Sequence, residues 1–228
     1  MVVDLATPQR PLPAAGLSWT WQPRGTGGAW TWCRIYHRSR HTPDGVTHRR
    51  FGPLHRFDHH TPADPPGICP RGRSVLYVAT NLATALGEVF GDLSIAEICP
   101  NYRVAIVGPR SPIDLLDLRG QGAAMRIGAL PSLATGAYAR DLTQQWARAI
   151  HEDQPAPNRT VHGVYYNAAH SNGPALALWD TDSMVETLHS GSAPQDFALS
   201  DPPLWPRIVH AAGTISLAVA TVSACASC

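Results

Sequence analysis

Short apolar segments of strand length recur along the chain, separated by turns rich in proline and glycine, of which the chain has 21 and 19. The alternation of apolar and polar residues predicts strands over residues 29–36, 74–79, 102–108, 112–117, 161–166 and 175–179. Helical periodicity is confined to residues 81–91 and 137–152. Many short strands with few helices predict an α+β domain, because neither class of element alone could bury the apolar faces.

The composition allows one domain with a sizeable core. The net charge is too small to give the protein a strong overall electrostatic field. The 228 residues are 44% hydrophobic and 15% charged, and 18 basic against 17 acidic residues leave a net charge of +1. Such a balance predicts no direct contact with nucleic acid. Every basic residue is an arginine, and many of them lie between Arg34 and Arg73. That segment suits a phosphate-bearing ligand, with a codon bias toward arginine as the alternative explanation.

The two ends of the chain differ in composition from its middle. Residues 1–28 are rich in proline and glycine and predict a loose N-terminal arm, followed by a single domain over residues 29–228. No basic region followed by an apolar core opens the sequence, so we expect a cytoplasmic protein. Residues 208–228 carry no charged side chain and are long enough to cross a bilayer. Their small polar residues favour a buried final strand or helix instead, and we expect no membrane contact.

Cysteine and histidine residues raise the question of a metal. The five cysteines are odd in number and irregularly spaced, which disfavours a disulfide framework. Cys225 and Cys228 have the spacing of a zinc or redox motif but no second pair. Asp58 lies among the histidines of residues 55–60, with His48 nearby, and this cluster raises the alternative of a metal-dependent hydrolase. Because no HExxH spacing is present, we expect solvated loop histidines and no metal.

The segment from 74 to 91, SVLYVATNLATALGEVFG, predicts a strand followed by a helix with one charged residue, Glu88. The apolar side chains of the helix share one stripe, which comprises Leu82, Ala85, Leu86, Val89 and Phe90. Glu88 lies off that stripe, on the side of Thr84 and Gly87. Two interpretations remain open at this point: a solvated glutamate on an exposed face, or a helix that lines a cleft in which the small Thr84 and Gly87 leave space for a ligand.

Four blocks of sequence, in this order, resemble the RES domain family: WCRIYH around Arg34, FGPLHRFD over 51–58, VLYVATNLATALGEVFG, and HGVYYNAAHSNGPALALW. The resemblance covers roughly residues 30–180, and the segment from Tyr77 to Phe90 is its most specific part. The family, named for arginine, glutamate and serine, supplies toxins of bacterial toxin-antitoxin pairs. It implies a fold like that of ADP-ribosyltransferase toxins, with mixed, mostly antiparallel sheets and a few flanking helices.

The resemblance also implies which residues meet the substrate. The arginines of the family fall on Arg34 and Arg56, its strand tyrosine falls on Tyr77, and its glutamate falls on Glu88. Arg34 and Glu88 are therefore the expected catalytic residues, and Arg56, Tyr77, Tyr36 and Asn167 the expected nucleotide-binding residues. The family serine falls on Ala168, so a substitute hydroxyl or amide is expected from Ser171 or Asn167.

The activity that the resemblance implies is consumption of NAD as a substrate, without a metal. Family members cleave the bond between nicotinamide and ribose and pass the ADP-ribosyl group to phosphate, water or a protein. A carboxylate such as Glu88 suits this chemistry because positive charge develops on the ribose ring. The expected activity is that of an NAD phosphorylase or glycohydrolase, with ADP-ribosylation of a protein as the alternative. A third alternative, motivated by Ala168, is a weakened NAD-binding module. The expected partner is a cognate antitoxin of the Xre type.

Overall fold

The computed structural model describes residues 5–23, 32–93, 95–135, 139–226 and 228. Within these residues the chain forms three α-helices and a main sheet of nine strands, with the order β1-β8-β9-β10-β5-β2-β7-β11 and with β14 also paired to β7. Neighbouring strands of this sheet are antiparallel except β8 and β9, which run parallel. The predicted α+β class with mostly antiparallel strands is therefore confirmed.

The helices are α1 (Leu82–Phe90), α2 (Arg140–Asp153) and α3 (Trp205–Gly213), with short 3-10 turns at Ala124–Ile127 and Pro131–Leu133. The strands of the main sheet are β1 (Ser18–Trp21), β2 (Trp32–His37), β5 (Val75–Ala79), β7 (Tyr102–Pro109), β8 (Ile113–Asp117), β9 (Gly163–Asn167), β10 (Pro174–Trp179), β11 (Val185–Thr187) and β14 (Asp196–Ala198). Three strand pairs lie apart from it: β3 (Phe51–Gly52) with β4 (Gly67–Ile68), β6 (Ile95–Ile98) with β15 (Ala218–Thr221), and β12 (His189–Ser190) with β13 (Ala193–Pro194).

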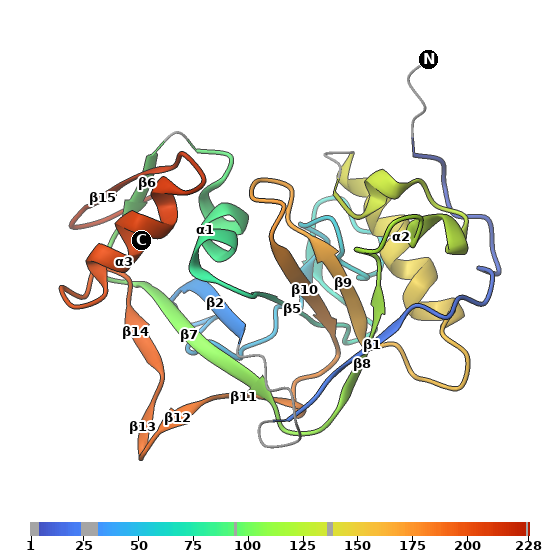
Figure 1. Cartoon of the computed structure of the whole chain (residues 1–228), viewed down its shortest axis with the longest axis horizontal. Helices are drawn as coiled ribbons and strands as arrows, with labels where there is room; N and C mark the ends of the chain where they lie inside the picture. The colour runs from blue at the N-terminus through green and yellow to red at the C-terminus, as the bar shows by residue number, and fades with distance from the viewer. Residues whose placement is uncertain (1–4, 24–31, 94, 136–138, 227) are drawn as a thin grey trace.

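The helices cover the sheet at two separate places. Figure 1 shows α1 and α3 together at one end of the molecule, beside β6 and β15, and α2 at the other end, beside β9. The buried faces differ accordingly: Trp146 of α2 packs in one cluster with Trp179 of β10, whereas Leu86 of α1 packs in another with Ile208 of α3. The predicted helices agree with α1 and α2 to within a few residues, although residues 136–138 lie outside the described part of the chain.

The expectation of a loose arm over residues 1–28 is wrong for the described residues 5–23. Trp21 of β1 is fully buried, and β1 pairs with β8 in the main sheet. Further upstream, the Ala6 carbonyl accepts a hydrogen bond from the Trp146 indole at 2.8 Å, and Arg10 forms ion pairs with α2. Burial of one large apolar side chain contributes roughly 2–3 kcal/mol, so this segment belongs to the folded core.

The C-terminal residues form α3 and then β15, which pairs in parallel with β6. The predicted final strand or helix is thus present, but three of the four residues of β15 are exposed, because this pair lies outside the main sheet. Among the described residues, no helix has the length and apolar character needed to span a bilayer.

A close contact between β9 and β10 requires a glycine. Gly163 opens β9 with φ of +151°, and a Cβ at this position would lie 2.1 Å from the Ala177 carbonyl oxygen of β10. Such a separation is far below any van der Waals contact, so a larger residue would force the strands apart. Gly163 thus fixes the pairing that carries Tyr166 toward α1.

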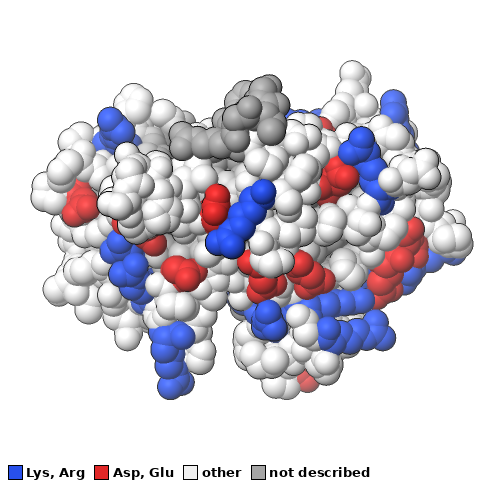
Figure 2. Space-filling model, turned by 90° about the horizontal axis from the view of Figure 1, so that it is seen from below, with Lys and Arg blue, Asp and Glu red and all other residues white. Residues whose placement is uncertain are grey.

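Charged side chains are mixed by sign on the surface. On the face seen in Figure 2, basic and acidic residues are interspersed. Many arginines in the described residues form ion pairs with carboxylates, including Arg103 with Asp196 and Arg119 with Asp117. The near balance of basic and acidic residues in the sequence is therefore also found on this face of the molecule.

Candidate functional site

A cleft of about 480 Å³ opens between β2, β5, α1, the end of β9 and the segment that precedes β5. This volume lies within the range of small-molecule sites. Among its lining residues, four arginines face two carboxylates: Arg34, Arg49, Arg56 and Arg140, with Glu88 and Asp92. The excess of cationic side chains favours an anionic ligand, and the forked guanidinium suits phosphate oxygens.

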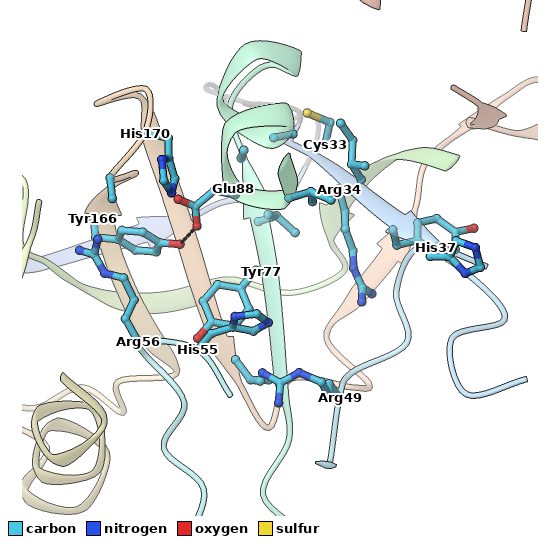
Figure 3. A pocket seen from close by; sticks show the side chains of 18 of the residues that line it. Cys33, Arg34, His37, Arg49, His55, Arg56, Tyr77, Glu88, Tyr166 and His170 are labelled. Atoms are coloured by element: carbon cyan, nitrogen blue, oxygen red, sulfur yellow. Dashed lines mark hydrogen bonds between the residues drawn. The ribbon is translucent and has the colours of Figure 1, made fainter. Parts of the chain in front are cut away.

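Glu88 lies on the wall of this cleft, which decides between the two interpretations of the lone carboxylate. Its helix begins after Asn81, whose side chain accepts a hydrogen bond from the Thr84 amide at 2.9 Å. Glu88 is half-buried, and its Oε2 accepts a hydrogen bond from the Tyr166 hydroxyl at 2.8 Å, the dashed line in Figure 3. Among the described residues, its Oε1 has no hydrogen-bond partner. One oxygen is held, and the other is available to a ligand.

The small residues beside Glu88 have a different role from the one expected. Thr84 and Gly87 do not line the cleft; they are buried against the turn between β9 and β10. A Cβ at Gly173 in that turn would lie 1.9 Å from the Thr84 hydroxyl, and one at Gly87 would lie 3.5 Å from the His170 Cβ. These positions are small because the turn and α1 approach closely, and this contact sets the distance from Tyr166 to Glu88.

Tyr166 is a site residue that sequence reasoning missed. It is fully buried in β9, and burial, together with the nearby charge of Glu88, raises the pKa of its hydroxyl well above the ordinary value. The hydroxyl therefore stays protonated and donates to Glu88. Its ring also packs against the Arg56 guanidinium at 5.0 Å. The sequence pattern around Tyr166, VYY in β9, indicates only a buried strand. It does not distinguish a site tyrosine from a core tyrosine.

The Arg56 guanidinium is held by backbone carbonyl groups at one nitrogen atom, while its other two nitrogen atoms lack a hydrogen-bond partner among the described residues. Its Nη2 donates to the carbonyl oxygens of Leu133 and Ala134 at 3.1 and 2.7 Å. Its Nε and Nη1 are buried and have no hydrogen-bond partner among the described residues. Buried donors of a charged group are costly when unpaired. A small shift of the Arg56 side chain toward the cleft would let a ligand pair with them.

Arg34 projects from β2 into the opposite side of the cleft (Figure 3). Its Nη1 donates to the Thr47 carbonyl at 2.7 Å and, more weakly, to the Gly45 carbonyl at 3.2 Å. Burial lowers the pKa of Arg34 to about 10, so it remains charged at neutral pH. Within the described part of the chain, neither Arg34 nor Arg56 has a salt bridge, which leaves both charges uncompensated.

The two predicted tyrosines both line the cleft, but each uses its hydroxyl inside the protein. The Tyr36 hydroxyl donates to Asp196 at 2.6 Å. The Tyr77 hydroxyl donates to Asp58 Oδ1 at 2.9 Å and accepts from the Phe57 amide at 3.2 Å. Both hydroxyl groups are therefore used within the protein, and a ligand would meet the ring of Tyr77.

Asp58 connects this tyrosine to Arg49. Burial alone would raise the pKa of Asp58, but the Arg49 guanidinium, which binds both carboxylate oxygens at 2.8 Å, holds it below the ordinary value. The charge of Arg49 is thus compensated, unlike those of Arg34 and Arg56. The segment between β2 and β5 supplies this support, and its His55 lies edge-on to Tyr77.

The residues expected to replace the family serine lie outside the cleft. Asn167 is not among the lining residues, because it follows Tyr166 in β9 and a strand turns successive side chains to opposite faces. Ala168 is buried, and the Ser171 hydroxyl accepts a hydrogen bond from the Gly173 amide at 3.2 Å within the β9–β10 turn. The described hydroxyl group that contacts Glu88 is that of Tyr166.

The histidines of residues 55–60 do not act together. His55 lines the cleft, whereas His59 is buried, with its Nε2 3.1 Å from Asp180, and His151 approaches the same carboxylate oxygen at 3.3 Å. His48 is also buried and contacts Thr181. The prediction of solvated loop histidines is therefore wrong for His48, His59 and His60, all of which are at most 6% exposed.

Burial of these histidines predicts a pH-dependent stability. Burial lowers the pKa of His59 to about 4 from an ordinary value of 6.5, so between these values the unfolded chain binds more protons than the folded one. The free energy of unfolding should fall as the pH decreases, by roughly 2 kcal/mol between pH 7 and pH 5 for His59 alone. His48 and His60 shift in the same direction.

Urea unfolding at the two pH values measures this effect. A His59→Gln variant should lose part of the dependence, whereas His210→Gln, at an exposed position of α3, should keep it. Equal unfolding free energies at pH 7 and pH 5 in the unsubstituted chain would contradict the prediction.

Comparison with known proteins gives a family and a fold. The family model described as the RES domain matches residues 31–200. The crystal structure of the M. tuberculosis MbcT-MbcA toxin-antitoxin complex contains a similar chain, with a TM-score of 0.51 and 18% sequence identity over 84% of this chain and 90% of that one. No curated protein sequence is similar enough to be matched.

Proposed function

The chain belongs to the RES domain family, and on that basis we propose that it is an enzyme that consumes NAD. The reaction is cleavage of the bond between nicotinamide and its ribose, with transfer of the ADP-ribosyl group to phosphate or water. The observation that carries this proposal is the arrangement in one cleft of a half-buried carboxylate, Glu88, and two arginines without ion-pair partners among the described residues. These groups suit a dinucleotide whose nicotinamide is bound to the ribose as a pyridinium.

Glu88 would act on the ribose. Nicotinamide is bound to the ribose as a pyridinium cation and leaves as a neutral molecule, so its departure needs little help from an acid. Positive charge instead develops on the ribose ring in the transition state. A carboxylate fixed by the Tyr166 hydroxyl stabilises that charge without having to reorient, and such preorganised electrostatics is often the largest catalytic contribution.

The arginines would position the substrate. Arg56, whose buried Nε and Nη1 have no hydrogen-bond partner among the described residues, would supply a cationic group for a phosphate, and Arg34 would supply a charge from the facing wall. Tyr77 lies between them and offers its ring to a base. Holding the dinucleotide at two points keeps the reacting ribose carbon next to Glu88, and positioning of this kind is worth several orders of magnitude in rate.

Two other activities fit the same cleft. A protein could accept the ADP-ribosyl group in place of phosphate or water. A weakened module that binds NAD without turnover is favoured by Ala168, because the family serine is replaced by a buried methyl group. The Tyr166 hydroxyl on Glu88 supports turnover over simple binding, because it holds the carboxylate in place.

The proposed biological role is that of the toxin in a toxin-antitoxin pair. It rests on membership of the RES domain family and on the likeness in fold to a chain of a solved toxin-antitoxin complex. The proposed partner is a cognate antitoxin of the Xre type that blocks the cleft. Depletion of NAD would be the means of toxicity, so an antitoxin that covers Arg34 and Arg56 would suppress it.

Release of nicotinamide from NAD by the purified chain tests this proposal. We expect release at a catalytic rate, and its dependence on added phosphate identifies the acceptor: ADP-ribose 1″-phosphate forms with phosphate, and free ADP-ribose forms with water. Release that appears only when a cell lysate is added, with label transferred to a protein band, would favour a protein acceptor. Saturable NAD binding without any release of nicotinamide would overturn the proposal of an enzyme and would support that of an NAD-binding module.

A further inference from the structure

Four metal-binding side chains meet away from the carboxylate of the cleft. His37 is the last residue of β2, Cys99 directly follows β6, and Cys225 and Cys228 belong to the segment after β15. The His37 imidazole nitrogen and the three sulfur atoms all lie within 4.8 Å of one another. Three segments far apart in the sequence thus bring three thiols and an imidazole to one point.

The sulfur–nitrogen separations match those of a tetrahedral zinc site, and the sulfur–sulfur separations are somewhat shorter. Zinc bound at about 2.3 Å to sulfur and about 2.0 Å to nitrogen requires sulfur atoms about 3.8 Å apart and sulfur and nitrogen about 3.6 Å apart. Cys99 Sγ lies 3.3 Å from both Cys225 Sγ and Cys228 Sγ, which are 3.5 Å from each other. The His37 Nε2 lies 3.6 Å from Cys99 Sγ and 3.5 Å from Cys228 Sγ.

A disulfide explains these contacts less well. Its sulfur atoms would be about 2.0 Å apart, whereas all three cysteines are free thiols in this structure. A bond between any two of them would leave the third sulfur and the imidazole without a role. Thiols are weak hydrogen-bond donors, so hydrogen bonding alone does not account for the convergence of all four groups.

The surroundings orient the ligands in the way that metal sites require. The His37 ring packs edge-on against Tyr102, with centroids 5.0 Å apart and an interplanar angle of 83°. The Cys225 amide and the Asn101 side-chain amide donate to Cys228 Sγ at 3.5 and 3.7 Å. Donors of this kind around a thiolate stabilise its charge and fix its direction.

We propose that His37, Cys99, Cys225 and Cys228 form a structural Zn²⁺ site. Four protein ligands close the coordination sphere, which is the arrangement of structural rather than catalytic zinc, and the thiolate-rich set selects a soft metal. The site is open to metal entry, since Cys99 is fully buried but Cys228 is exposed. This differs from the sequence expectation of no metal, because Cys99 and His37 supply the second pair that the Cys225–Cys228 motif lacks.

Zinc at this position would join the C-terminal segment to the wall of the cleft. His37 lines the cleft and follows Arg34 and Tyr36 on the same strand. The described part of the C-terminal segment after β15 is otherwise mostly exposed and has little apolar burial to hold it. The metal would therefore hold both this segment and the end of β2 in place, independently of the reaction in the cleft.

Metal analysis of the full chain, purified under reducing conditions with any affinity tag removed, tests the site. We expect about one zinc ion per chain and its loss in a Cys225→Ser/Cys228→Ser variant. Cys69→Ser is the matched control, because this buried thiol lies outside the cluster and contacts Thr61. Removal of the zinc by a chelator should lower the Tm of the unsubstituted chain and of the Cys69→Ser variant alike.

Cobalt gives a second readout that needs no variant. Co²⁺ added to the metal-free chain should produce the intense visible d–d bands of tetrahedral coordination and a near-ultraviolet band of sulfur-to-metal charge transfer. Equal zinc content in the double variant, or a cobalt spectrum without these bands, would overturn the proposal. If the double variant fails to fold, the cobalt spectrum of the unsubstituted chain decides the question alone.

Discussion

A Glu88→Gln substitution should lower kcat for nicotinamide release from NAD by about 100- to 1,000-fold, with a much smaller change in KM. Glutamine has almost the same shape and can still accept a hydrogen bond from the Tyr166 hydroxyl, so the fold should be kept. What is lost is the negative charge opposite the developing charge on the ribose. Initial rates over a range of NAD concentrations separate the two constants.

Glu186→Gln is the matched control for this change. Glu186 lies on β11, is half-exposed, and pairs with Arg110 away from the cleft. The Glu186→Gln substitution should leave kcat and KM unchanged. Expression of the unsubstituted chain and of Glu186→Gln should slow bacterial growth, whereas Glu88→Gln should not. Equal turnover by Glu88→Gln and the unsubstituted chain would show that this carboxylate has no part in the reaction.

An Arg56→Ala substitution should raise KM for NAD by roughly 10- to 100-fold, since a hydrogen bond to a charged group is worth about 1.5–3 kcal/mol. The reason is the loss of a guanidinium charge from the lining of the cleft, together with its unpaired Nε and Nη1 donors. Lysine should not restore binding, because one ammonium group cannot reach the Leu133 and Ala134 carbonyls and also donate to a phosphate.

The same change has a structural cost that must be measured separately. Without Arg56, the carbonyl oxygens of Leu133 and Ala134 lose their donor, so the free energy of unfolding should fall by about 1–2 kcal/mol. Arg50→Ala removes an exposed arginine that pairs with Asp182 and should change neither quantity. Binding of NAD measured by calorimetry at a temperature where all variants are folded completes the comparison, and unchanged affinity in Arg56→Ala would exclude a binding role.

Local patterns predicted the elements of this fold but not its long-range contacts. The apolar stripe of α1 and the alternation of β5, β7 and β10 depend on neighbouring residues, and these elements agree with prediction. Pairing of β1 with β8 depends on residues 94 positions apart, as between Thr20 and Asp114, and leaves no local signal. A segment rich in proline can therefore be mistaken for an arm although its tryptophan is in the core.

The candidate site follows the same rule. Family resemblance supplied Arg34, Arg56, Tyr77 and Glu88, and the structure brings all four to one cleft. Periodicity alone placed Glu88 off the apolar stripe without showing what faced it. Tyr166 was missed because an apolar strand context is the same for a core tyrosine and for one whose hydroxyl holds a carboxylate. Asn167 was expected to bind the nucleotide but does not line the cleft. It is next to Tyr166 in β9, and neighbouring residues of a strand point to opposite faces.

The hydrogen bond between Tyr166 and Glu88 spans 78 residues of chain, and it determines when during synthesis the site can exist. A nascent chain that has reached the end of α1 carries the carboxylate but not the strand that holds it. The cleft wall is complete only after β10 has left the ribosome and paired with both β5 and β9. A shorter incomplete chain lacks the strand that holds Glu88, so the proposed reaction could begin only after most of the chain has been made.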